Sequence, residues 1–236
     1  MSDARTEVLA RVREALGRGT DAAPAPAVVP RAYRPAGEHA RGSAATLDLL
    51  VDRLVDYRAH VHRVAGHEVA DVVARLVGEA READDPDAED SHRAAARPEP
   101  GPVVVPDGLD RAWLAGLPDD AVRTDARDAP LSAAELDAAR AVVTAARVAV
   151  AVTGTIVLDA EPDQGRRAVS LVPDVHVCVV RSDQVVQTVP EAVRLLGEHP
   201  GRPQTWISGP SATSDIELDR VEGVHGPRTL HVVLVS

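Results

Sequence analysis

What this 236-residue sequence lacks excludes several classes of protein. It contains no lysine, no asparagine and no phenylalanine, and aromatic residues make up only 2% of it. Without lysine there is no P-loop of the GxxxxGK[ST] type, and the dinucleotide motif GxGxxG and the nucleophile motif GxSxG are also absent. The sequence therefore predicts neither P-loop ATP hydrolysis nor nicotinamide binding of the usual kind. Its core has to be built from Val, Leu and Ala.

Cysteine is almost absent as well. The single Cys178 excludes an internal disulfide, and it excludes an iron–sulfur cluster held by this chain alone, which usually takes about four thiolates. Its valine neighbours predict a thiol buried on a strand. No apolar run approaches the roughly 20 residues of a membrane-spanning helix, and no apolar signal segment follows Met1. We expect a cytoplasmic protein without a cofactor of its own.

Charge and histidine spacing exclude two further kinds of site. The chain has 37 acidic and 26 basic residues, a formal net charge of −11, and its arginines are scattered singly. Nucleic-acid binding needs a basic surface that releases counterions, so we expect no nucleic-acid partner. His60 and His62 share one face of a predicted strand, but no third ligand at a recognisable spacing accompanies them. We therefore expect no metal site.

Apolar spacing and proline content predict two regions. Residues 1–42 read as an N-terminal helix over 3–17 on a proline-rich tether, and residues 43–236 as an α/β domain with a variable acidic insertion near 82–100. Within the domain, helices are predicted over residues 46–59, 68–80, 109–117 and 189–196 and from residue 132, and strands over 60–64, 103–105, 148–152, 155–158, 175–180, 205–207 and 230–235. This alternation predicts an open, mostly parallel sheet flanked by helices.

The first candidate site segment lies between the strands predicted over 148–152 and 155–158. Gly154 permits a tight bend or a close approach of a ligand to the backbone, and Thr155 adds a hydroxyl that could hold an anion. The plainer interpretation is a hairpin turn, which needs no ligand.

The second candidate segment directly follows the strand predicted over 205–207. Ligands of open α/β sheets bind beyond the carboxyl ends of strands, which is where this segment would lie. Its hydroxyl and carboxyl side chains could bind a cation, hold an anion or move a proton, although a hydroxyl here could also serve as a helix N-cap. These candidates are Ser208, Ser211, Thr213, Asp215 and Glu217.

The third candidate segment precedes the last strand. His225 lies between glycines in a predicted loop, where it could act as a general base, bind a ligand or simply bond to the turn backbone. Arg228 and Arg220 are the nearest guanidinium groups that could pair with a carboxylate ligand.

Four segments in order resemble the LUD-domain family. They are residues 153–158, 171–180, 208–217 and 223–227, so the tight resemblance covers about residues 140–236. One departure is Val152, at a position that is often acidic in the family. The resemblance implies a fold similar to the sugar-isomerase and CoA-transferase (NagB/RpiA-like) superfamily. It further implies a role in oxidising L-lactate to pyruvate in a three-protein system whose two companion proteins carry the iron–sulfur centres.

The resemblance names no catalytic residue for this subunit, so the motif residues are candidates for ligand binding. The leading hypothesis is a subunit of an L-lactate utilization system that binds a small carboxylate or a partner surface. One alternative is a free-standing enzyme acting on a sugar phosphate or an acyl-CoA. Another is an assembly or regulatory module without a small-molecule site, which the tethered amphipathic helix would suit.

Overall fold

The computed structural model describes residues 4–17, 30, 32–33, 36–80, 101–210, 212–213, 221–222 and 226–236. The chain divides into two compact units, residues 1–33 and 34–236. The first unit contains the predicted N-terminal helix, α1 (Ala4–Ala15), none of whose side chains is buried. The acidic insertion predicted near 82–100 lies outside the described residues.

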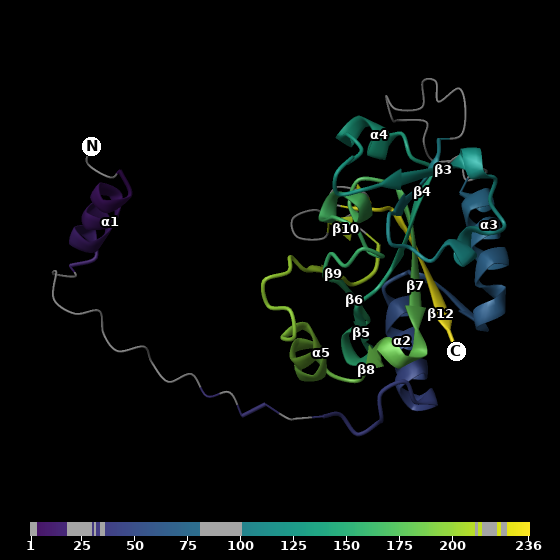
Figure 1. Cartoon of the computed structure of the whole chain (residues 1–236). Helices are drawn as coiled ribbons and strands as arrows, with labels where there is room; N and C mark the ends of the chain where they lie inside the picture. Colours follow the sequence, from purple (N-terminus) through teal and green to yellow (C-terminus); the bar gives the residue numbers. More distant parts are fainter. Residues whose placement is uncertain are drawn as a thin grey trace. The chain divides into compact units, whose positions relative to one another are not determined.

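The larger sheet of the second unit has six parallel strands among the described residues, which confirms the predicted open, parallel architecture (Figure 1). In sheet order they are β1 (His60–Val64), β12 (Thr229–Val235), β7 (Val175–Arg181), β4 (Ala141–Ala145), β2 (Val103–Pro106) and β3 (Val122–Asp125). Strand β12 thus lies between β1 and β7, although these three strands are far apart along the chain.

A second sheet, which the sequence analysis did not predict, has four strands in the described part of the chain. Its order is β8 (Val185–Val186), β5 (Val148–Val150), β6 (Thr155–Leu158) and β9 (Thr205–Ile207). Strands β5 and β6 are antiparallel and pair Val150 with Thr155, so the hairpin interpretation of the Gly154 segment is confirmed. A short antiparallel pair, β10 (Ala212–Thr213) with β11 (Val221–Glu222), completes the strands.

The α-helices in the described part of the second unit are α2 (Ala44–Asp56), α3 (Val69–Glu79), α4 (Ala133–Asp137) and α5 (Val189–Leu196). Helix α4 starts where its predicted capping residue places it. Ser132 and Glu135 form the predicted capping box, in which each side chain bonds to the other residue's backbone N–H. Helix α4 is nevertheless only five residues long, and the helix expected over 109–117 is a 3-10 turn over Arg111–Leu114.

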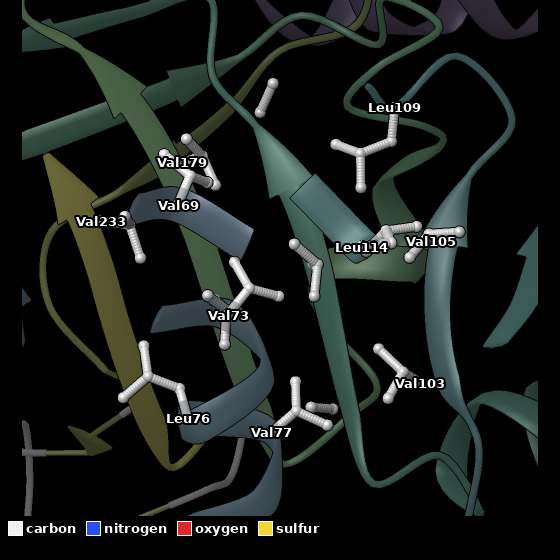
Figure 2. Close-up of a cluster of buried hydrophobic side chains, with 14 of the residues drawn as sticks. Val69, Val73, Leu76, Val77, Val103, Val105, Leu109, Leu114, Val179 and Val233 are labelled. Atoms are coloured by element: carbon white, nitrogen blue, oxygen red, sulfur yellow. The ribbon is translucent and has the colours of Figure 1, made fainter. Parts of the chain in front are cut away.

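The two faces of the larger sheet carry separate cores. Figure 2 shows one of them, where Val69, Val73, Leu76 and Val77 recur at helical spacing on α3 and pack on sheet residues such as Val179. On the opposite face, α2 and the second sheet pack together against alternate residues of β7 and β12. That core is formed by Leu50, Leu54, Ala149, Ile156, Cys178, Val180, Val232 and others.

Candidate functional site

The candidate site is a cavity of about 440 Å³ beside the amino ends of β7 and β12. It is lined from β7 by His176, from β12 by Leu230, and from the second sheet by β9 and the residues after it. The 3-10 turn η6 (Arg167–Ser170) supplies a further wall. The lining residues are Arg167, Ser170, Leu171, His176, Gln204, Thr205, Trp206, Ile207, Ser208, Gly209, Pro210, Gly226, Pro227 and Leu230.

This location differs in part from the expected one. Ser208 follows a strand's carboxyl end, as predicted, but that strand is β9 of the second sheet. The parallel strands β7 and β12 contribute their second residues, His176 and Leu230, and so face the cavity with their amino ends. The physical reason is that β9 belongs to an antiparallel pair with β6, so its direction is not tied to that of the larger sheet.

The structure brings Thr155 and Ser208 together. The two hydroxyl oxygens are 2.8 Å apart, and the Thr155 hydroxyl also lies 2.8 Å from that of Thr153. Ser208 lines the cavity, whereas Thr155 does not. Thr155 therefore holds Ser208 in place, and Ser208 is the hydroxyl available to a ligand.

Gly154 and Gly209 let the backbone approach helix α2. Gly154 has a φ of +57°, and a Cβ atom on it would lie 2.9 Å from the Cβ of Arg53. Gly209 has a φ of +81°, and its Cβ would lie 2.7 Å from the Cβ of Tyr57. Both positions thus require glycine for packing. Gly154 does not line the cavity.

Two arginines behave differently from what the sequence suggested. Arg228, the expected carboxylate partner, lies 4.0 Å from Asp174 at the start of β7 and does not line the cavity. The sequence analysis did not single out Arg167, which is exposed and lines the cavity, and no ion pair joins it to another described residue. Its neighbour Arg166 instead binds the buried carboxylate of Asp125 with two nitrogens.

The remaining predicted site residues cannot be placed. Ser211, Asp215, Glu217 and His225 lie outside the described residues. Of Thr213 the structure gives the backbone alone, which pairs with Val221 in the short β10–β11 pair. These positions stay predictions, although Ser208–Pro210 and Gly226, which flank two of the segments, line the cavity.

His176, within the strand predicted over 175–180, is buried but also lines the cavity. Its Nε2 atom lies 2.8 Å from the hydroxyl of Thr144 on β4. Its Nδ1 atom is buried and has no hydrogen-bond partner among the described residues. Burial lowers the pKa of His176 to about 4, so the imidazole is neutral at neutral pH. No periodicity in the sequence distinguishes this histidine from an apolar strand residue.

A second group of histidines lies on the other face of the larger sheet. The ring of His231 stacks on that of His60, with centroids 5.0 Å apart, and its Nδ1 lies 3.3 Å from Nε2 of His62. No group of three or more His, Cys, Asp or Glu side chains in the described ranges is placed to hold a metal ion. Burial, followed by the charge of Arg75, lowers the pKa of His62, and burial, followed by the charge of His60, lowers that of His231 to about 4.

These lowered values predict a loss of stability in acid. A histidine has a pKa of about 6.5 in the unfolded chain, so between that pH and about 4 the unfolded state binds more protons than the folded state. The stability contributed by neutral His176 and His231 is present above about pH 6.5 and is lost as the pH falls toward 4. Urea midpoints measured from pH 7.5 to 4.5 should fall, and His231→Gln should flatten the decline. A midpoint that does not change over this range would contradict the prediction.

None of the helices in the described residues has the length and apolar character needed to cross a membrane. The comparisons with known proteins agree with the resemblance noted in the sequence. The LUD domain family model matches residues 47–235. Lactate utilization protein C of Deinococcus radiodurans is 42% identical to the chain over 238 residues, covering 100% of the chain and 97% of the relative. Lactate utilization protein C of Bacillus subtilis is 34% identical over 100 residues, which cover 40% of the chain and 41% of that relative.

A solved structure is also similar. The crystal structure of a DUF162 family protein from Deinococcus radiodurans superposes with a TM-score of 0.64 at 40% identity, covering 84% of the chain and 99% of that protein. The family match spans the α/β unit apart from its first residues and Ser236, and includes both sheets and every described wall of the cavity. The chain therefore belongs to the LUD-domain family.

Proposed function

We propose that this protein is a subunit of an L-lactate-oxidising system that works with iron–sulfur partner proteins and binds a small carboxylate in the cavity. The similarity to lactate utilization protein C of Deinococcus radiodurans, which extends over the full chain, supports the role in lactate utilization. The single thiol, Cys178, is buried, and burial raises its pKa to about 12, which keeps it protonated. The electron carriers are therefore assigned to the partners.

Arg167 is the observation that carries the carboxylate assignment. In a chain of net charge −11, many of the described arginines pair with carboxylates, such as Arg63 with Asp48 at 2.6 Å. Arg167 has no such partner among the described residues and lies at the cavity wall. A guanidinium group binds a carboxylate through two parallel hydrogen bonds, so an anionic ligand would complete its pairing.

The rest of the wall suits a small organic acid. Leu171, Ile207 and Leu230 present apolar surface that would take a methyl group, and the hydroxyls of Ser170 and Ser208 can bond to ligand oxygens. The cavity volume of about 440 Å³ lies within the roughly 300–1,000 Å³ that is typical of small-molecule sites. Arg167 would bind and orient the carboxylate, and the apolar wall would exclude water from the rest of the ligand.

The proposal is tested by purifying the tagged protein from its own organism grown on L-lactate. We expect iron–sulfur proteins to co-purify and the preparation to reduce a dye when L-lactate is added. Arg167→Ala should leave co-purification intact and raise the KM for L-lactate about 10- to 100-fold, since a hydrogen-bonded charge contributes about 1.5–3 kcal/mol. Arg194→Ala is the matched control, because Arg194 is exposed on α5 and bonds to Pro190 of its own helix.

Three outcomes would argue against the proposal. A solitary protein, together with normal growth on L-lactate after deletion of its gene, would defeat the lactate assignment. If the Arg167→Ala protein forms an intact complex with an unchanged KM for L-lactate, the cavity is not where the carboxylate binds. Stabilisation of the purified protein by inorganic phosphate but not by L-lactate would favour a sugar-phosphate enzyme instead.

A further inference from the structure

The Nδ1 atom of His176 is a polar group in need of a partner. It is buried, it belongs to a side chain that lines the cavity, and no described residue bonds to it. A buried polar atom left without a hydrogen bond destabilises the folded state. Whether Nδ1 would donate or accept a hydrogen bond depends on which ring nitrogen carries the proton, and the partners on the other side of the ring decide that.

A directed chain of hydrogen bonds places that proton. The register between β4 and β7 sets Thr144 opposite Cys178, next to His176. The carbonyl oxygen of Ala145 can only accept, so the protonated thiol of Cys178, 3.8 Å away, donates to it. The Thr144 hydroxyl lies 3.8 Å from the same sulfur and donates to it in turn. Thr144 has then used its one hydrogen, and its oxygen accepts from His176 Nε2, 2.8 Å away.

The consequence is a lone pair without a partner on a buried side chain that lines the cavity. With the proton on Nε2, the Nδ1 atom of a neutral imidazole can only accept a hydrogen bond. A carbonyl or carboxylate oxygen of a ligand has no hydrogen to give to it, whereas a hydroxyl group has one. The ring therefore distinguishes between a hydroxyl and a keto group at the ligand atom that it meets.

We propose that His176 accepts a hydrogen bond from the hydroxyl group of a 2-hydroxy acid, and that this contact makes the cavity selective for 2-hydroxy acids over 2-oxo acids. The inference rests on the proposed function, because the carboxylate of the same ligand pairs with Arg167. Arg167 thus holds a group common to all small acids, and His176 recognises the group that differs between the reduced and the oxidised form. His176 is a specificity residue of the site.

Calorimetric titration of the purified full-length protein with L-lactate, pyruvate and propionate tests the proposal without any mutation. L-lactate should bind about 2- to 10-fold more tightly than propionate, which lacks the hydroxyl, since one hydrogen bond contributes about 0.5–1.5 kcal/mol. Pyruvate should bind no better than propionate, because its keto oxygen would face the Nδ1 lone pair. Equal affinities for the three acids would overturn the role of His176 but leave the Arg167 site standing. Failure of all three to bind would overturn the cavity assignment itself.

Two variants test the chain of hydrogen bonds. Thr144→Val removes the hydroxyl that accepts from Nε2, so the ring can carry its proton on Nδ1, and the preference for L-lactate over pyruvate should disappear. His176→Gln keeps an amide near Thr144 and lacks an atom equivalent to Nδ1, so the same loss is expected. Retention of the preference in a folded Thr144→Val protein would overturn the directed chain. Because both positions are buried, the three-acid series on the unmodified protein decides the matter if either variant fails to fold.

Discussion

Arg166→Ala is expected to lower the free energy of unfolding by about 3 kcal/mol. Arg166 donates to both carboxylate oxygens of Asp125, at 3.0 and 2.8 Å, and to the carbonyl of Leu131. Asp125 is only 4% exposed, and removing one partner of a buried pair leaves an uncompensated charge at a cost of about 3–5 kcal/mol. The lower end applies here, because the Leu131 N–H still donates to Asp125.

Arg167→Ala is the control, one residue further along the same chain. Its guanidinium pairs with no described carboxylate, so the free energy of unfolding should change by no more than about 0.5 kcal/mol. Urea denaturation at pH 7 compares the two variants directly. An equal loss of unfolding free energy in the two variants would mean that the buried Asp125 carboxylate does not depend on Arg166. It would also contradict the assignment of a stabilising role to Arg166 and a ligand-binding role to Arg167.

Gly154→Ala should destabilise the protein by about 2–5 kcal/mol. The left-handed φ of +57° costs an alanine about 1–2 kcal/mol, and the new Cβ would lie 2.9 to 3.2 Å from atoms of Arg53, two of them backbone. Overpacking against a backbone that cannot move adds a further cost of about 1–3 kcal/mol. The hairpin of β5 and β6 would have to withdraw from helix α2.

Gly78→Ala makes the same chemical change as Gly154→Ala, but it is expected to stabilise the protein. Gly78 lies inside α3, and a Cβ on it would meet nothing within 4 Å, so alanine should stabilise the helix by about 0.5–1 kcal/mol. Thermal unfolding of the two variants gives the comparison. If Gly154→Ala lowers the stability only slightly, the hairpin of β5 and β6 can move away from α2. Close approach of a ligand to the backbone would then again be the explanation for glycine at this position.

The sequence predicts the main architecture because its apolar patterns are local. Helix α3 and the buried strand β7 have periodicities that neighbouring residues alone reveal. The sequence analysis did not predict strand β4, because its alanines follow a capped helix and favour an extension of that helix. The second sheet was missed because its short strands acquire partners only through the tertiary fold.

The candidate site was only partly predictable for the same reason. Ser208 and Thr155 belong to recognisable motifs, and the structure joins them. Arg166 and Arg167 are neighbours of the same residue type, and they differ because Arg166 alone binds Asp125. Asp125 lies 41 residues from Arg166 along the chain, so no local pattern reveals the pair. The partnerless nitrogen of His176 results from how the second sheet covers β7, which no local pattern encodes.

The position of β12 in the larger sheet has a consequence for how the protein forms during synthesis. Strand β1 pairs only with β12 among the described strands, with His60 opposite His231, so β1 gains a neighbour only after synthesis has reached β12. Until residues 229–235 leave the ribosome, β1 and one side of β7 present unpaired edges, which are templates for aggregation. Closing so long a loop is entropically costly and slow. A nascent chain of this protein therefore depends on shielding of those two edges until its last strand is inserted between them.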